Sequence, residues 1–132
     1  MIVVAAVIEQ QGKILVCQRK RGARHEFKWE FPGGKVEHGE EPRAALVREL
    51  QEELAIDAQV DREMVRYEHS YQGRDPILLI FYRVKKFKGT PTNVVFETIE
   101  WSAPHALASY DFLDGDVDFV RRLGRGEYSA AP

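Results

Sequence analysis

The sequence predicts an α/β protein, with an α/β/α sandwich built around a mixed β-sheet. Several short segments are rich in β-branched and aromatic residues, which is the composition of strands. One strongly patterned helix is expected within residues 33–56, and a second helix at residues 114–123. Strands combined with one early helix and one late helix favour a sheet that carries helices on both faces.

The length and charge of the chain limit the classes to which it can belong. A chain of 132 residues fits one domain, which we expect to span residues 1–132. A net charge of −2 provides no broad basic surface for a nucleic acid polymer, although a single nucleotide needs only a local cationic pocket. The apolar N-terminal segment is too short to cross a membrane. We therefore expect a cytoplasmic monomer or homodimer that does not bind membranes, with Cys17 as a buried structural thiol.

The first part of the chain predicts a hairpin followed by a loop. Residues 2–9 form a continuous apolar run rich in β-branched side chains, which is typical of a buried strand. A glycine-containing turn at residues 10–13 separates this run from a second strand at residues 13–19. Residues 20–28 form a cationic loop, and residues 29–31 are extended because the residue before a proline avoids the helical region.

The second half of the chain predicts strands at residues 65–70, 77–84 and 98–101. The segment at 77–84 is the most strand-like of the chain, and we expect it to be central in the sheet. The remaining expected elements are a turn at 72–76, a lysine-rich loop at 85–93 and a short helix at 104–109.

In the last helix, residues 114–123, apolar side chains recur at i, i+3 and i+6 as Val117, Val120 and Leu123. Gly124 and Gly126 end this helix. We expect the remaining residues, from about 125 to 132, to be a frayed tail.

The helix expected within residues 33–56 carries two different stripes. Pro42 suits its first turn, where a missing N–H costs nothing. An apolar stripe at i, i+3 and i+7 is formed by Val47, Leu50 and Leu54. A second stripe, at i, i+3 and i+4, consists only of carboxylates and is formed by Glu49, Glu52 and Glu53.

The carboxylate stripe calls for an explanation, because like charges at these spacings repel one another and anions are disfavoured near a helix C-terminus. A hard divalent cation supplies one, since Mg²⁺, with Mn²⁺ as a substitute, takes oxygen ligands and keeps waters for exchange with phosphate. The alternative is a solvated acidic helix face with no metal.

The residues around this stripe decide between the two interpretations. Gly34, five residues, Glu40, seven residues, and then Arg48-Glu49-Leu50-Gln51-Glu52-Glu53 together resemble the Nudix box, the signature of the Nudix hydrolases. The box covers about a sixth of the chain and fixes many positions at set spacing. The chain departs from it at Ala55, where the family usually has a glycine that eases the helix exit.

The resemblance implies the Nudix-type α/β/α fold and a set of metal ligands. Those ligands are the carbonyl of Gly33 and the side chains of Glu49, Glu52 and Glu53. Glu40 and Arg48 would support them, because an arginine one helical turn from Glu52 can orient it. We include Arg48 with the catalytic residues, although the favoured interpretation of Arg48 is a purely structural role. A further carboxylate often comes from a distant loop in this family; Glu97 is the best match, and Glu100 is the alternative.

The segment from Trp29 to Lys35 resembles the MutT-type nucleoside triphosphate hydrolases, a subgroup of the family. The implied substrate-binding residues are Arg19, Arg24, Glu30, Phe31, Pro32, Gly33 and Asp116. Phe31 would form a wall of the base pocket, against the alternative of plain core packing. The two arginines are placed like phosphate or sugar contacts, against the alternative of solvated surface cations.

Asp116 opens the last helix, where MutT-like proteins carry an Asn or Asp that reads the base. The alternative for Asp116 is a helix N-cap, and the neighbouring Asp114 and Asp118 compete for the base-reading role. The four histidines show no metal-ligand spacing, and we assign none of them to catalysis.

The resemblance implies Mg²⁺-dependent hydrolysis of a nucleoside or deoxynucleoside triphosphate to the monophosphate and pyrophosphate. Oxidised purine triphosphates and CTP-like nucleotides are the leading candidates, which would give the protein a role in nucleotide-pool sanitation. The alternatives are hydrolysis of a dinucleoside polyphosphate, ADP-ribose or a nucleotide sugar, or a catalytically inactive sensor that binds a nucleotide. A sensor should lose the helix carboxylates, and here all three remain.

Overall fold

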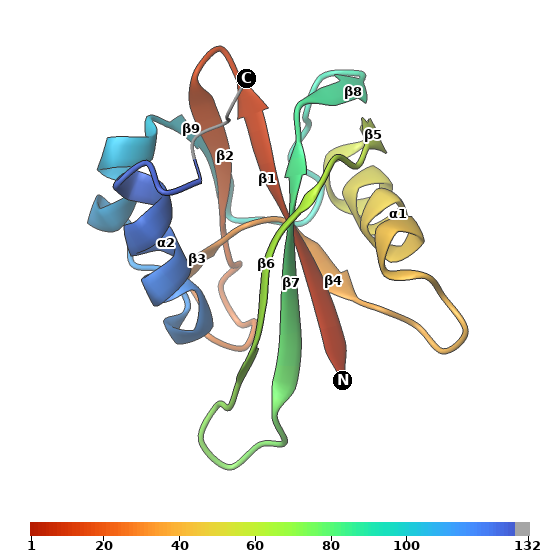
Figure 1. Cartoon of the computed structure of the whole chain (residues 1–132), viewed down its shortest axis with the longest axis vertical. Coiled ribbons are helices and arrows are strands. Elements are labelled where there is room, and N and C mark those ends of the chain that lie inside the picture. Colours follow the sequence, from red (N-terminus) through yellow and green to blue (C-terminus); the bar gives the residue numbers. More distant parts are fainter. Residues whose placement is uncertain (129–132) are drawn as a thin grey trace.

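The computed structural model describes residues 1–128 as a mixed sheet with helices on both sides (Figure 1). The seven-stranded sheet has the core order β3-β2-β1-β7-β6, while β4 pairs with β1 and β9 pairs with β2. Its strands are β1 (Ile2–Gln10), β2 (Lys13–Gln18), β3 (Trp29–Glu30), β4 (Gly33–Lys35), β6 (Glu63–His69), β7 (Ile77–Val84) and β9 (Thr98–Ser102). The predicted α/β/α sandwich is confirmed.

Helices cover the two faces of the sheet (Figure 1). Helix α1 (Pro42–Leu54) lies on one face, and the other face carries two 3₁₀ helices, η1 (Pro104–Ser109) and η2 (Asp114–Asp116), with α2 (Val117–Gly124). Within the described residues, none of the helices has the length and apolar character needed to cross a membrane.

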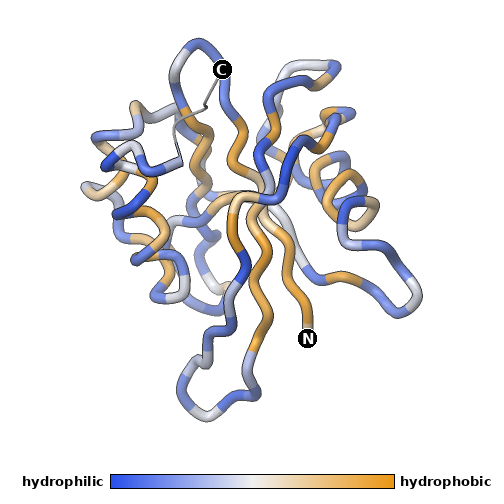
Figure 2. The backbone as a smooth tube through the Cα atoms, in the orientation of Figure 1, coloured by the Kyte–Doolittle hydropathy of each residue, from blue (hydrophilic) through white to orange (hydrophobic). Residues whose placement is uncertain are grey.

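The strand β1 is apolar from Ile2 to Ile8 because both of its faces are covered there, as the orange backbone at the centre of Figure 2 illustrates. Val4, Ala6 and Ile8 pack into the core under α1, whereas Ala5 and Val7 pack into the core under α2. Strand β1 runs parallel to β7 and antiparallel to β2, with which it forms the expected hairpin. The expected central position of residues 77–84 is also confirmed.

Helix α1 packs through a face that overlaps the predicted stripe. Leu50 and Leu54 are fully buried as expected, but Val47 is only partly buried, and Ala45 and Leu46 take its place in the core. The helix ends at Ala55, which adopts a left-handed conformation with φ 57° and donates its N–H to Gln51 at 3.0 Å. This is the conformation that a glycine would adopt without steric cost.

The predicted helix at residues 114–123 is wrong at its start. Residues 114–116 form the 3₁₀ turn η2, and the α-helix begins only at Val117. Val120 and Leu123 face the core as predicted, whereas Val117, at the junction with the tighter turn, is 41% exposed and Phe119 takes its place in the core.

Two further expectations at the surface need correction. The loop expected at residues 85–93 contains β8 (Lys86–Lys88), which pairs with β5 (Asp57–Gln59) in a separate two-stranded sheet. The expected tail is held at its beginning, because Tyr128 packs against Phe119 at 5.2 Å and its carbonyl accepts a hydrogen bond from Arg83. The rest of that tail, residues 129–132, lies outside the described residues.

Candidate active site

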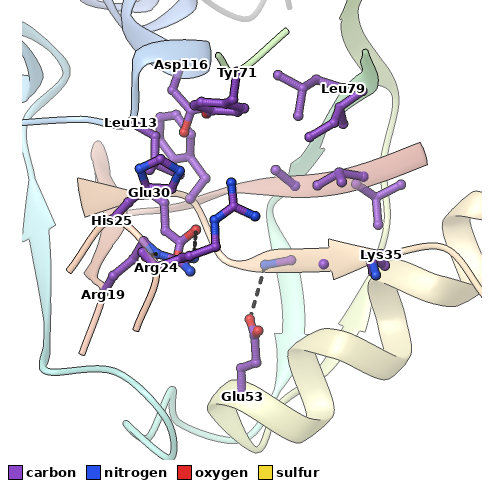
Figure 3. Close-up of a pocket in the computed structure, with 17 residues that line it drawn as sticks. Arg19, Arg24, His25, Glu30, Lys35, Glu53, Tyr71, Leu79, Leu113 and Asp116 are labelled. Atoms are coloured by element: carbon purple, nitrogen blue, oxygen red, sulfur yellow. Dashed lines mark hydrogen bonds and ion pairs between the residues drawn. The ribbon is translucent and has the colours of Figure 1, made fainter. Parts of the chain in front are cut away.

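A pocket of about 280 Å³ opens between the sheet, the segment at residues 30–35 and the η2 turn. Its residues come from distant parts of the chain, including Ala5 on β1, Glu53 on α1 and Leu79 on β7. Figure 3 shows Asp116 and Tyr71 at one end of the pocket, Glu53 at the other, and Arg24 between them. The pocket therefore connects the carboxylate face of α1 to the start of α2.

Phe31 forms part of the apolar wall of this pocket and also belongs to the core. It is 3% exposed, and its ring lies 5.2 Å from Phe112 and 5.9 Å from Phe119. The two roles considered for Phe31 are thus compatible. Pro32, in contrast, is buried outside the pocket lining, and its carbonyl accepts the N–H of Ala6 at 2.8 Å. The pocket therefore gives no support to the predicted substrate contact of Pro32.

Asp116 projects a carboxyl group into the pocket from the end of η2. It is 6% exposed and makes no capping hydrogen bond to α2, and its backbone is helical, with φ −100° and ψ −14°, rather than extended as at a typical N-cap. Burial, and next the charge of Glu30, raise the pKa of Asp116 to about 8. Asp116 thus stands at the N-cap position of α2, but its side chain does not act as the cap. The competing Asp114 and Asp118 are exposed and lie outside the pocket lining.

The raised pKa of Asp116 predicts how stability depends on pH. An unfolded aspartate titrates near pH ~3.9, so between about pH 4 and 8 the folded protein binds the extra proton. This stabilising contribution is fully present below pH ~4 and is lost as the pH rises to about 8. Asp116→Asn should therefore gain stability relative to wild type with rising pH, by on the order of a few kcal/mol at pH ~9. Urea melts of both proteins at pH ~5, 7 and 9 measure the difference, and a constant difference would contradict the buried carboxyl.

The predicted arginines occupy different positions at the pocket. Arg19 is bound to Glu30, with its Nη1 3.2 Å from both carboxylate oxygens, and its Nε donates to the carbonyl of Arg24 at 2.6 Å. Arg24, Lys35 and His25 line the pocket together with Arg19. Because Glu30 neutralises Arg19, the cations available to an anionic ligand here are Arg24 and Lys35. Neither Lys35 nor His25 was assigned a role from the sequence.

The carboxylates of α1 lie against the glycine strand β4. Glu53 is the most deeply placed, and its Oε1 accepts the N–H of Gly33 at 3.1 Å. Burial, with the nearby charges of Glu49 and Glu30, raises the pKa of Glu53 to about 9. Glu49 packs against Gly34 so closely that a Cβ on that glycine would lie 2.5 Å from the carboxyl carbon. The glycines of β4 therefore let the backbone approach the helix carboxylates directly.

Arg48 connects the carboxylates of α1 to the preceding loop. Its Nε and Nη2 bind both oxygens of Glu40, at 2.8 and 3.0 Å, and Nη2 also donates to the carbonyl of Lys35. Its Nη1 lies 2.9 Å from Glu49 and 3.4 Å from Glu52. Arg48 thus partly neutralises the carboxylate stripe. A supporting role for Arg48 and Glu40 requires contacts of this kind.

The exposed Glu52 predicts a small effect on stability. It faces Glu49 and Glu53, which repel it, and forms an exposed i,i+4 pair with Arg48, which attracts it. Each term is worth only a few tenths of a kcal/mol. Glu52→Gln should therefore change the free energy of unfolding in EDTA by less than about 0.5 kcal/mol, with a slight gain expected. A loss of about 2 kcal/mol or more in thermal or urea melts would show a structural ion pair instead.

The two candidates for a distant carboxylate lie outside the pocket lining. Glu97 is exposed, and its Oε1 accepts the N–H of Arg21 at 3.2 Å. Glu100 on β9 accepts the hydroxyl of Tyr110 at 2.9 Å. Over residues 1–128, no group of three His, Cys, Asp or Glu side chains is arranged to hold a metal ion as it stands.

The donor set of α1 and β4 nevertheless fits a hard divalent cation. Glu53 is a partly buried carboxyl with further carboxylates near it, and its burial together with the charges of Glu49 and Glu30 raises its pKa to about 9. Carboxylate and carbonyl oxygens are the ligands that such a cation prefers. The buried Cys17 is adjacent, but burial raises its pKa well above the usual value, which agrees with an inert structural thiol.

Comparison with known proteins gives a consistent assignment. The family model described as NUDIX domain matches residues 1–123. A CTP pyrophosphohydrolase of Escherichia coli (strain K12) is 40% identical over 118 residues, which cover 89% of this chain and 87% of that protein. An 8-oxo-dGTP diphosphatase of the same strain is 33% identical and covers 94% of this chain and 95% of its own.

Solved structures agree in fold over nearly the whole chain. The solution structure of the E. coli ORF135 protein has a TM-score of 0.85 and 37% identity, and covers 99% of this chain and 92% of that one. A MutT Nudix hydrolase from Burkholderia pseudomallei has a TM-score of 0.82 and 26% identity, and covers 98% and 97%. On the strength of the family match and of these relatives, the chain belongs to the Nudix family and is a Nudix hydrolase.

Proposed function

We propose that this Nudix hydrolase cleaves a nucleoside triphosphate to the monophosphate and pyrophosphate. The observation that carries the proposal is the single pocket that contains Glu53 of α1 and, at its other end, Asp116, with Phe31 in its wall. A nucleotide with its base between Phe31 and Asp116 would direct its phosphates toward Glu53. Relatives named as a CTP pyrophosphohydrolase and as 8-oxo-dGTP diphosphatases support the same reaction.

Nudix hydrolases generally need a divalent metal, and here we propose Mg²⁺, with Mn²⁺ as a substitute. The Gly33 carbonyl with Glu49, Glu52 and Glu53 would hold it. When bound, the ion neutralises charge on the phosphoryl oxygens and makes a bound water more acidic. Glu97 is proposed as a further ligand on the resemblance alone. Its carboxylate accepts the N–H of Arg21 and would have to give up this hydrogen bond to reach the metal.

The protein's own residues would bind and orient the substrate. Arg24 and Lys35 line the pocket, and within residues 1–128 neither is paired with a carboxylate. These two cations would bind the polyphosphate. Arg19 would hold Glu30 in place, since the two are paired at 3.2 Å. Arg48 would orient Glu49 and Glu52, with which it is paired at 2.9 and 3.4 Å.

The base would be read by Asp116. With a pKa of about 8, this carboxyl is mostly protonated at neutral pH and can both donate and accept a hydrogen bond. That pattern suits a base edge with an amine or N–H donor beside an acceptor, such as cytosine or an oxidised guanine. By hydrolysing a free nucleotide of this kind, the protein would take part in nucleotide-pool sanitation in the cytoplasm.

A turnover screen tests the proposed function. The protein is incubated with MgCl₂ and, separately, CTP, dCTP, 8-oxo-dGTP, dGTP, ADP-ribose and diadenosine polyphosphates, with EDTA controls. We expect the highest specificity constant on a triphosphate and loss of turnover in EDTA. A preference for ADP-ribose or a diadenosine polyphosphate would reject the triphosphate assignment, and binding without turnover on every compound would favour a sensor.

A further inference from the structure

Two tyrosine hydroxyls hold both backbone polar groups of Gly115. Tyr67 donates its hydroxyl hydrogen to the Gly115 carbonyl at 2.6 Å, and the Gly115 N–H donates to the Tyr71 hydroxyl oxygen at 3.2 Å. Tyr67 lies on β6 and Tyr71 just beyond its end, over forty residues before the glycine. The η2 turn is therefore fastened to the sheet by these two side chains.

The contact between Tyr71 and Gly115 leaves no free space. A Cβ on Gly115 would lie 2.8 Å from the Tyr71 hydroxyl and 3.1 Å from the His69 ring. Tyr71 in turn has the rings of His69 and His25 at centroid distances of 4.5 and 5.1 Å. The Tyr71 ring is thus packed against aromatic neighbours from two different segments, and Tyr71 lines the pocket as well.

The Gly115 carbonyl belongs to the peptide that leads into Asp116. The Asp116 amide is used in the η2 turn, where it donates to Leu113 at 2.9 Å, but its carboxyl makes no capping bond. The depth at which this carboxyl enters the pocket is therefore determined by the backbone of Gly115, which the two tyrosines hold.

We propose that Tyr67 and Tyr71 are positioning residues that set the place of Asp116 in the base pocket and so determine the selectivity between bases. The inference rests on the proposed function, in which Asp116 reads the base. Neither tyrosine needs to contact the phosphates, because Glu53 lies at the other end of the pocket. Loss of either hydroxyl should affect base selection and leave the phosphate chemistry unchanged.

The test compares Tyr67→Phe, Tyr71→Phe and wild type, all as the full chain. One measurement is kcat and KM on the best and worst triphosphates of the turnover screen. The other, which needs no turnover, is calorimetric binding of CMP against UMP and of 8-oxo-dGMP against dGMP, in EDTA. In each variant the preference for the best over the worst base should fall about tenfold relative to wild type. The loss should appear in KM and in the monophosphate affinity, while kcat changes by less than about twofold.

Two controls separate positioning from general damage. Tyr110→Phe removes a hydroxyl that donates to Glu100 at 2.9 Å, away from Gly115, and should leave selectivity unchanged. Gly115→Ala should lower selectivity in the wild-type background. It should lower selectivity less in the Tyr71→Phe background, where the hydroxyl 2.8 Å from the new Cβ is absent.

The outcomes distinguish this inference from the proposal on which it rests. If wild type discriminates between bases and both tyrosine variants discriminate equally well, the inference is overturned alone. If the variants weaken binding of every nucleotide by the same factor, the tyrosines are merely structural and the inference is also overturned. If wild type binds all four monophosphates equally, base reading by Asp116 is rejected and the inference falls with it.

Discussion

Glu53→Gln should retain the fold and lower kcat by roughly 10²- to 10³-fold at saturating Mg²⁺, the scale on which an electrostatic catalytic group contributes. The fold should survive because the raised pKa of Glu53, about 9, makes its carboxyl neutral at pH ~7 without metal. Glutamine has the same shape, and its amide oxygen can accept the N–H of Gly33 as Glu53 does. The metal, in contrast, needs the ionised carboxylate.

The matched control for this variant is Glu41→Gln, the same chemical change at an exposed position that precedes α1. Steady-state turnover over a range of MgCl₂ concentrations, with melting curves in EDTA, makes the comparison. The control should retain wild-type turnover. Near-normal turnover of Glu53→Gln would remove Glu53 from the set of metal ligands, and a large loss of stability in EDTA would make it a structural residue.

Asp116→Ala should reduce kcat/KM for the best triphosphate by about tenfold or more and change poor substrates much less. The physical reason is that a good substrate pairs its base with a carboxyl that is 6% exposed, and loss of that partner leaves a buried polar group of the base unpaired. The proposed metal ligand Glu53 lies at the other end of the pocket, so the phosphate chemistry should not be altered.

Specificity constants on several triphosphates, with melting as a check of folding, measure this effect. Asp118→Ala is the matched control, because Asp118 is exposed and pairs with Arg122 at 3.2 Å outside the pocket. An equal loss on every substrate would mean that the substitution disturbs the site in general. Unchanged selectivity would leave base choice to the apolar wall around Phe31.

Periodicity predicted the parts of the fold that depend on burial. The run at residues 2–9 and the segment at 77–84 are apolar because both faces of the central sheet are covered, so both are visible in the sequence. Strand β8 was missed because only Phe87 of its three residues packs inward, which leaves no alternation to recognise. The start of α2 was missed because a 3₁₀ turn shifts the helical phase by an amount that the sequence does not specify.

In the candidate site, too, the sequence predicts the residues that follow a local rule and misses those that only the fold brings together. The carboxylates of α1 follow from i, i+3 and i+4 spacing, which is a local rule, and the Glu49–Arg48–Glu52 contacts are equally local. Tyr71 and Lys35 reach the pocket only through the folded arrangement of segments far apart in the chain. The neighbourhood of Tyr71 carries no pattern that distinguishes a pocket residue from an ordinary surface residue. Lys35 ends the segment that resembles the MutT-type hydrolases, but the resemblance implied no role for this side chain.

The central claim is that a bound divalent metal enables the protein to cleave a triphosphate into a monophosphate and pyrophosphate. The most direct measurement is ³¹P NMR of the best triphosphate during turnover in MgCl₂, followed by the same reaction in EDTA and after MgCl₂ is restored. We predict equal amounts of nucleoside monophosphate and pyrophosphate, no products in EDTA, and recovery on restoring the metal. Release of inorganic phosphate with a nucleoside diphosphate, or undiminished turnover in EDTA, would contradict the account.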